Sequence, residues 1–235
     1  MFISFTVVRY PKYLIPVAFM SMAILRLPLL FTKGLSFWKL LGCGKNGTFD
    51  LSSDLQQWSL IATWNTEEDF NQFLHSSFVQ KWWKTFTTEQ WTLLCIPYES
   101  HGQWSGQEPF SPTNVNKNYQ GKIAVLTRAS IKLSKAASFW KNVPAVSASL
   151  NEAEGVIVAV AIGEMPLIRQ ATFTVWESLD DVKNFAYRQR AHAEAIKKTR
   201  SEQWFSEELF ARFIPIKSFG SIQGIKEVEI NNVTV

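Results

Sequence analysis

Two stretches of this 235-residue chain align with each other without a gap, and this internal repeat constrains the fold more than any other feature. Residues 58–73 read WSLIATWNTEEDFNQF, and residues 170–185 read QATFTVWESLDDVKNF. Trp64 and Trp176 coincide at the point where an alternating, strand-like pattern ends. Each stretch then carries a hydroxyl residue and, three positions later, an aspartate, which is a signal for the start of a helix: Thr66 with Asp69, and Ser178 with Asp181. The repeat predicts the same strand-to-helix unit in both halves.

The order of predicted elements is also the same in both halves: strand, helix, strand, strand, helix, strand. The expected strands are 2–9, 37–44, 58–64, 91–98, 122–132, 155–163, 170–176 and 211–217. The expected helices are 13–30, 67–84, 135–150 and 179–200, with a short helical turn at 202–209. This β-α-β-β-α-β order is the ferredoxin-like pattern, and two such sheets can bury their bare faces against each other. We expect an α+β protein with duplicated ferredoxin-like halves, of the dimeric α/β-barrel type.

Gly, Pro, Ser and Asn gather in residues 99–121, which predicts a linker between the halves. The first ferredoxin-like half is therefore expected at 1–98 and the second at 122–218. Residues 219–235 are expected to form a tail.

The composition limits the classes of partner. The chain is 46% hydrophobic with 10 Trp and 18 Phe, so a large core is expected. The net charge of +4 comes from basic residues that are spread along the chain, and nucleic acid is not an expected partner. Two cysteines, Cys43 and Cys95, supply neither a disulfide framework nor a zinc ligand set, which fits a reducing cytoplasm. The oligomeric state stays open.

The strongly apolar residues 13–25 are fewer than the about 20 that a membrane-spanning helix needs. The strand-like residues before them and the lack of a small-residue cleavage site argue against a signal peptide. Two interpretations remain: a buried first helix, or an apolar surface beside a membrane or a lipidic substrate.

Among the three histidines, His192 has the most informative position. His75 and His101 are expected on the surface. The helix expected from residue 179 has an apolar stripe that His192 joins, because it lies seven residues after Phe185 and four before Ile196. Spacing leaves two interpretations open, a hydrogen-bonded core histidine and a ligand.

Three arginines are also candidate site residues, because an inward-facing arginine needs an anionic partner. Arg188 and Arg200 lie four residues before and eight after His192, on roughly the same helix face, and Arg128 lies in an expected strand. Haem propionates would serve as partners, and so would carboxylates such as Glu164 or Glu207.

Residues 42–47 match the G-x-G-x-x-G pattern of dinucleotide sites. No helix is expected to open at the last glycine, so the N-terminus that should face a pyrophosphate is missing. These glycines are interpreted instead as a turn or as a close approach of the backbone to something bulky.

Several tracts along residues 5–215 carry a family resemblance. They are Arg26-Leu27-Pro28, residues 37–49, Ala62-Thr63-Trp64, Trp91-Thr92, Trp104-Ser105-Gly106, Leu126-Thr127-Arg128-Ala129, Phe139-Trp140, Val143-Pro144, Ile162-Gly163-Glu164, Pro166, His192-Ala193, Ala195-Ile196, Arg200, Glu202, Trp204-Phe205 and residues 207–213. In these tracts the sequence resembles the spheroidene monooxygenase family of carotenoid oxygenases.

The resemblance implies haem b as the cofactor and oxygen insertion next to the end of an acyclic carotenoid, giving a hydroxy and then a keto product. It also implies reduced ferredoxin as electron donor. Of the three histidines only His192 lies in a matching tract, so it inherits the role of proximal iron ligand, with Cys43 as the rival. Arg128, Arg188, Arg200 and Trp204 are expected at the cofactor, the arginines near its propionates.

The resemblance also gives the apolar residues 13–25 a role, as the entry for a lipid-soluble substrate. The expected location is cytoplasmic, peripheral to the inner membrane. Two other functions stay open: a haem enzyme of different chemistry, such as a dehydratase or a peroxidase-like protein, and a non-catalytic module for ligand binding or dimerisation.

Overall fold

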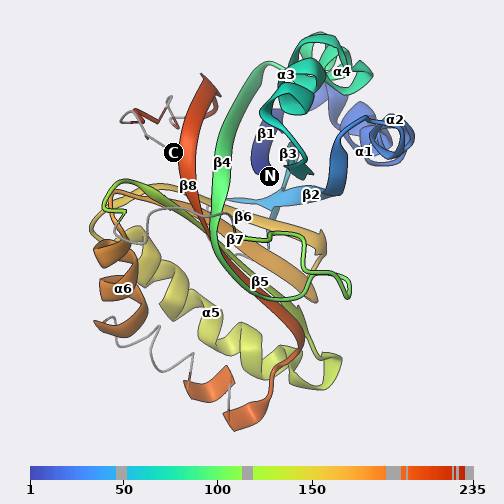
Figure 1. Ribbon diagram of the computed structural model, residues 1–235. Coiled ribbons are helices and arrows are strands. Elements are labelled where there is room, and N and C mark those ends of the chain that lie inside the picture. Colours follow the sequence, from blue (N-terminus) through green and yellow to red (C-terminus); the bar gives the residue numbers. More distant parts are fainter. Residues whose placement is uncertain are drawn as a thin grey trace.

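The computed structural model describes residues 1–45, 52–112, 119–188, 197–199, 201–223, 225 and 228–230. Eight strands close into an antiparallel barrel in the order β1-β3-β2-β6-β7-β5-β8-β4 (Figure 1). The strands are β1 (Phe2–Arg9), β2 (Leu35–Gly44), β3 (Ser53–Trp64), β4 (Glu89–Gly102), β5 (Ile123–Ile131), β6 (Val156–Met165), β7 (Arg169–Trp176) and β8 (Phe205–Ser221). The helices are α1 (Ile15–Ile24), α2 (Arg26–Leu30), α3 (Glu67–Ser76), α4 (Phe78–Phe86), α5 (Ala136–Asn151) and α6 (Leu179–Arg188), with short 3-10 turns at Lys12–Leu14 and Leu133–Lys135.

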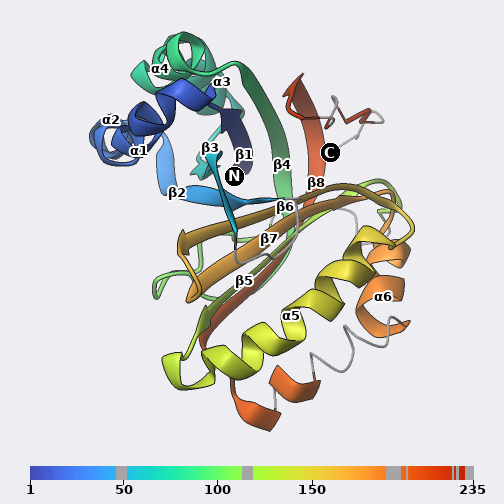
Figure 2. The ribbon, with the colours of Figure 1, turned by 180° about the vertical axis from the view of Figure 1, so that it is seen from behind.

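The two halves contribute four neighbouring strands each, in the orders β4-β1-β3-β2 and β8-β5-β7-β6. Helices α1 to α4 cover the outside of the first set, and α5 and α6 cover the outside of the second (Figures 1 and 2). The expectation of an α+β barrel is confirmed. The halves join along a long β4–β8 seam and along a β2–β6 seam with only two recorded pairs, Gly42 with Gly163 and Cys43 with Ile162.

A matching turn precedes β2 and β6. Gly34 and Gly155 have φ values of 72° and 79°, in the left-handed region that favours glycine. Their backbone oxygens accept hydrogen bonds of 2.9 and 2.8 Å from the residues that follow the tryptophans ending β3 and β7. A Cβ at Gly34 would lie 2.1 Å from Cγ of Asp69, and one at Gly155 would lie 2.5 Å from Cγ of Asp181. These aspartates belong to the two predicted capping signals, so the repeat extends to the packing of each turn against its helix.

The barrel interior is a packed core. Phe5 and Phe173 stack with their ring centres 4.1 Å apart, and Phe213 lies beside Phe173. Trp104 and Phe110, from the segment expected to be a linker, are buried in the same interior cluster. The linker interpretation is therefore too simple: β4 runs on to Gly102, and the aromatic residues after it pack into the core because burying them is favourable.

Two predicted element boundaries are wrong, and a third lies partly outside the described residues. Residues 205–209 are strand, not helix, because β8 pairs with β5 along this length and with β4 from Leu209 on. The helix expected at 67–84 is two helices, because Ser77 has extended backbone angles and its hydroxyl caps α4 at the N–H of Gln80. The helix expected at 179–200 is described as α6 up to Arg188; residues 189–196 and 200 lie outside the described part of the chain.

The N-terminal helices lie on the surface. Lys12–Leu30 is long and apolar enough to cross a membrane by length and composition, but only 22% of it is buried. This helical stretch is longer than residues 13–25, on which the sequence-based estimate of length was made. Both ends of this stretch join strands of the barrel, β1 and β2, and only a narrow stripe of its side chains is buried against the barrel. The following large apolar side chains are exposed: Tyr13, Phe19, Met20, Ile24, Leu27, Leu30 and Phe31. Of the two interpretations, the structure shows the apolar surface.

Candidate functional site

A pocket of about 120 Å³ lies between the outer face of the second-half strands and helices α5 and α6; we name it the helix pocket. Its walls are mainly aromatic and aliphatic, with a few hydroxyls. They are Val125, Thr127, Val146, Ser147, Leu150, Thr172, Thr174, Trp176, Val182, Phe185, Ala186 and Phe210. The rings of Trp176 and Phe185 are 5.3 Å apart, so α6 packs directly on β7.

The helix pocket suits a flat apolar group in its chemistry but not in its size. Pockets for such ligands usually measure about 300–1,000 Å³. No described side chain that lines the helix pocket is of a type that binds iron. A haem would therefore need α5 and α6 to lie further from the sheet.

The predicted iron ligand, His192, follows four residues after the end of α6 at Arg188. His192 and Arg200 are outside the described residues, as is the side chain of Arg188 at the end of α6. Both described histidines are exposed, and Nε2 of His101 lies 2.9 Å from Oε1 of Glu99. Within the described ranges, no group of three His, Cys, Asp or Glu side chains could hold a metal ion. The assignment of His192 stays a prediction.

Cys43 is poorly suited to be the rival ligand. It is 2% exposed, and burial raises the pKa of its thiol to about 12. The thiolate is the form that binds metals, and at neutral pH this cysteine is a thiol.

Arg128 lies in the barrel interior, at one end of the core. Its guanidinium pairs with Glu207 of β8 and lies 3.8 Å from Glu164 of β6, and it sits 5.6 Å above the ring of Trp104. Lys39 is 3.3 Å from Glu164. These inward side chains, with Arg169, form the charged end of the barrel. Of the two kinds of partner foreseen for Arg128, carboxylates are the one that the structure shows.

The turn at Trp104 closes this end. Nε1 of Trp104 donates to Glu164 at 2.7 Å, and the N–H groups of Ser105 and Gly106 donate to Glu207 at 3.1 and 2.8 Å. Burial alone would raise the pKa of Glu207, but these N–H donors and Arg128 together lower it below its usual value. Glu207 is therefore ionised at neutral pH.

Trp204 is buried at the start of β8, next to α5. Its Nε1 donates to Glu202 at 2.8 Å, its ring meets that of Phe139 edge-on, and Ser138 also donates to Glu202. Neither Trp204 nor Arg128 lines the helix pocket. Arg128 faces the opposite side of the sheet, because side chains alternate along β5. The structure therefore does not bring these two residues together, and their contact with a cofactor stays a prediction.

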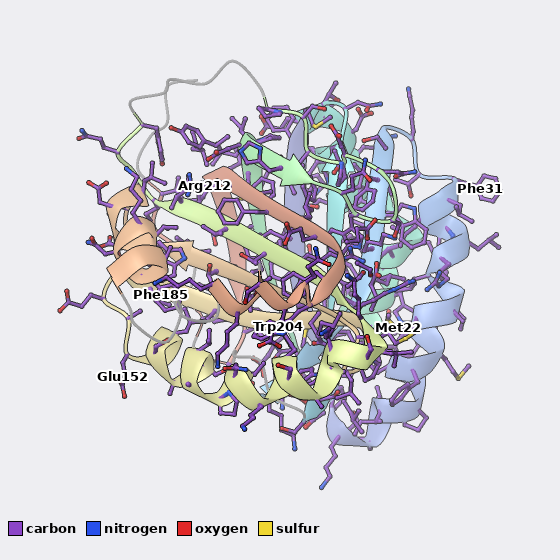
Figure 3. All side chains as sticks on the ribbon, turned by 90° about the horizontal axis from the view of Figure 1, so that it is seen from below. Met22, Phe31, Glu152, Phe185, Trp204 and Arg212 are labelled. Carbon is purple, nitrogen blue, oxygen red and sulfur yellow. The ribbon has the colours of Figure 1, made fainter. Side chains whose placement is uncertain are left out.

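A larger groove of about 540 Å³ lies over the short β2–β6 seam; we name it the seam groove. One wall comes from α1 and β3, with Phe19, Met22, Leu55 and Trp58, and the other from Trp140 of α5 and the β6–β7 turn. Met22 lies on the side of α1 toward the end of α5 (Figure 3). The sequence did not predict this groove, although the glycine tract at 42–47 was a signal for it.

Four tracts that carry the family resemblance meet in the seam groove. Its lining includes Arg26, Gly42, Cys43, Gly44, Trp140, Ile162, Gly163, Glu164 and Pro166. These residues are far apart in the sequence and are brought together by the pairing of β2 with β6.

The β6–β7 turn that forms part of the wall is strained. Leu167 has a φ of 68°, a left-handed conformation that costs a branched residue about 1–2 kcal/mol. Its carbonyl accepts a hydrogen bond of 3.0 Å from Nε1 of Trp140. The turn and α5 are thus tied together at the rim of the groove. Strain of this kind is common at ligand sites.

Two solved aldoxime dehydratases share the fold. The alignments have TM-scores of 0.63 and 0.62 and cover 94% and 91% of this chain, and 81% and 79% of those chains. The second enzyme was solved in complex with butyraldoxime. The sequences are 11% and 9% identical, so this similarity shows the fold alone.

No protein-family model matches the chain, but three curated relatives do, each named spheroidene monooxygenase. The relative from Rubrivivax gelatinosus is 36% identical over 84% of this chain and 74% of its own length. The relative from Cereibacter sphaeroides is 35% identical over 80% of this chain, which spans 58% of that protein. The relative from Rhodobacter capsulatus is 33% identical over 89% of this chain and 88% of its own length. With a match of that extent, the chain belongs to the spheroidene monooxygenase family.

Proposed function

We propose that this protein is a haem-dependent monooxygenase that acts on an acyclic carotenoid. The observation that carries the proposal is the identity of 33–36% to three spheroidene monooxygenases over 80–89% of the chain. The printed names of these relatives give both the type of reaction and the class of substrate. Oxygen insertion into an unactivated C–H bond also lies beyond the chemistry of side chains alone, so a cofactor is required.

In the proposed reaction, one atom of O₂ enters the C–H bond and gives the alcohol, and the other leaves as water. Two electrons from a ferredoxin-type donor and two protons complete this step. A second hydroxylation at the same carbon, followed by loss of water, gives the ketone.

The helix pocket is the proposed haem site, with α5 and α6 lying further from the sheet when haem is bound. Its aromatic and aliphatic walls suit the faces of a porphyrin, and α6 leads along the chain toward His192, the proposed iron ligand. Arg188 and Arg200 flank His192 in the sequence and are the proposed partners of the propionates. Arg128 and Trp204 are not part of this proposed site, because neither lines the helix pocket and their described partners are Glu207 and Glu202.

We also infer that the two halves arose by duplication and that the protein works at the cytoplasmic face of the inner membrane. The first inference is supported by the paired Gly34 and Gly155 turns. The second is supported by the exposed apolar helices α1 and α2, whose flanks carry the exposed cations Lys12, Arg26 and Lys33. Residues 1–49 contain no acidic residue, which suits an anionic lipid surface.

Reconstitution with hemin tests the cofactor. The full chain should take up haem and show a Soret band, which His192→Ala shifts or abolishes, while His75→Ala, at an exposed site, leaves it unchanged. No haem uptake by the wild-type protein would contradict the proposal and would favour a non-catalytic ligand-binding module.

Turnover tests the reaction. With reduced ferredoxin, O₂ and an acyclic carotenoid, the haem-loaded protein should form a product that is heavier by one oxygen atom, and ¹⁸O₂ should label it. Haem uptake without carotenoid oxidation would instead point to a haem enzyme of different chemistry, such as a dehydratase.

A further inference from the structure

The floor of the seam groove is bare backbone. Gly42 and Gly163 pair across the seam, and both positions face outward, because Leu41, Cys43 and Ile162 beside them point into the barrel. Two facing glycines leave a shallow trough between the walls that carry Trp58 and Trp140.

The missing side chain at Gly42 is not explained by the protein's own packing. A Cβ there would meet only a ring atom of Trp58 at 3.8 Å and the carbonyl oxygen of Gly163 at 3.9 Å, which are ordinary contacts. The φ of Gly42 is not among the positive values that favour glycine. At Gly163, in contrast, a Cβ would come within 3.0 Å of the carbonyl oxygen of Arg169. Gly163 is needed by the fold, whereas Gly42 keeps space open.

The two carboxylates at the groove have cations beside them. Asp54 pairs with Arg9 at 2.8 Å, and Glu164 lies near Lys39, Arg128 and Arg169. Arg26 also lines the groove and is exposed to solvent. The remaining walls are largely aromatic and aliphatic, so burying an apolar occupant there is favourable.

The seam groove and the helix pocket are neighbours along β7. Gln170 lines the groove, and Thr172, the next residue on the same face of β7, lines the pocket. Such neighbours are only about 7 Å apart along a strand. Helix α5 runs over both, with Trp140 at the groove and Val146 at the pocket (Figure 2). The other end of the groove opens beside Phe19, which is half exposed on the apolar face of α1.

We propose that the seam groove binds the extended apolar chain of the substrate on its glycine floor and directs one end of that chain into the helix pocket. The class of ligand, a long polyene, rests on the proposed function. The location rests on the open floor, the cations beside both carboxylates and the neighbouring helix pocket. A volume of about 540 Å³ is within the usual range for ligand pockets.

The test measures binding without turnover. Immobilised full-length protein is incubated with an acyclic carotenoid in detergent micelles, washed, and extracted, and the carotenoid bound per protein is determined. Gly42→Leu, which fills the floor, should lower the affinity at least tenfold. Ala23→Leu also introduces a leucine, on an exposed part of α1 that does not line the groove, and should bind like wild type.

Leu55→Glu is a second variant for the case that Gly42→Leu unfolds. Leu55 is 44% exposed, so the change should leave the melting temperature unaltered while it places a charge in the groove. It should raise KM for the carotenoid more than it lowers kcat. Wild-type affinity in a folded Gly42→Leu or Leu55→Glu protein would overturn the groove assignment and leave the monooxygenase proposal standing. A wild-type protein that takes up haem and binds no carotenoid would overturn both the substrate class and this site.

Discussion

Arg128 of β5 pairs with Glu207 of the neighbouring strand β8 at the end of the barrel core, and this ion pair ties the two strands to the turn at Trp104. Arg128 is 3% exposed, so its charge depends on nearby carboxylates. The family tracts that contain Trp104, Arg128, Glu164 and Glu207 thus form a structural unit, whatever other contacts they make.

Glu207→Gln should destabilise the protein by about 2 kcal/mol at pH 7. Removing one partner of a fully buried pair costs about 3–5 kcal/mol, and the side chain of Glu207 is 24% exposed, so the effect is reduced. Urea unfolding measures the loss. The control is Glu208→Gln, the exposed neighbour, which should change the free energy of unfolding by less than about 0.5 kcal/mol.

The same pair should make the stability depend on pH. The folded-state pKa of Glu207 is lowered, so its contribution is fully present above the unfolded pKa of about 4.3 and is lost as the pH falls through the folded value. The wild-type free energy of unfolding should therefore fall more steeply than that of Glu207→Gln below about pH 4.5. Parallel curves for the two proteins would show that Glu207 is not held by these contacts.

Gly34→Ala tests the repeated turn. A φ of 72° costs a residue with a Cβ about 1–2 kcal/mol, and here the Cβ would also collide with Asp69, which caps α3. The matched control is Gly106→Ala, which has the same φ and no atom within 4 Å of the added Cβ. Thermal unfolding should show a larger loss for Gly34→Ala than for Gly106→Ala. Equal losses would mean that backbone conformation alone requires glycine there.

Leu167→Gly should be tolerated unusually well. Glycine relieves the positive φ, which offsets the lost side-chain contacts and the greater freedom of the unfolded chain. Met165→Gly is the control, because Met165 is equally exposed, ends β6 and has no positive φ. In urea unfolding, Leu167→Gly should be more stable than Met165→Gly by about 1 kcal/mol. The opposite order would show that Leu167 is not strained.

The barrel could be predicted from the sequence because its strands follow local alternation and helices α3 and α6 start at clear capping signals. Residues 205–209 were misread because Phe-Ser-Glu-Glu-Leu suits a helix by composition, whereas pairing with β4 and β5 decides the outcome. The same limit applies to Ser77, whose capping of α4 splits one expected helix into two.

Only part of the candidate site could be predicted from the sequence. Carboxylate partners for Arg128 could be anticipated, since a buried arginine requires them. The seam groove could not, because it exists only where β2 meets β6 and where α1 and α5 form its two walls. Its glycines were the sequence signal that pointed to this region.

The apolar face of α1 and α2 should bind lipid. Leu27 and Leu30 are 63% and 66% exposed, and Phe31 projects away from the molecule (Figure 3). Replacing both leucines by glutamate should weaken binding to anionic vesicles by at least about tenfold, since burying each leucine contributes about 1.5 kcal/mol or more. The melting temperature should not fall, because these side chains make little contact with the core. Vesicle flotation measures the binding.

The charges beside this face predict how the binding responds to salt and to lipid. Lys12, Arg26 and Lys33 should make the wild-type protein prefer anionic over neutral vesicles, and the preference should shrink as the ionic strength rises. Leu133→Glu is the matched control, because Leu133 is 77% exposed on the 3-10 turn before α5, outside this face. If Leu133→Glu reduces flotation as much as the double variant does, the attachment is not made by α1 and α2. A wild-type protein that does not float at all would contradict the predicted lipid binding.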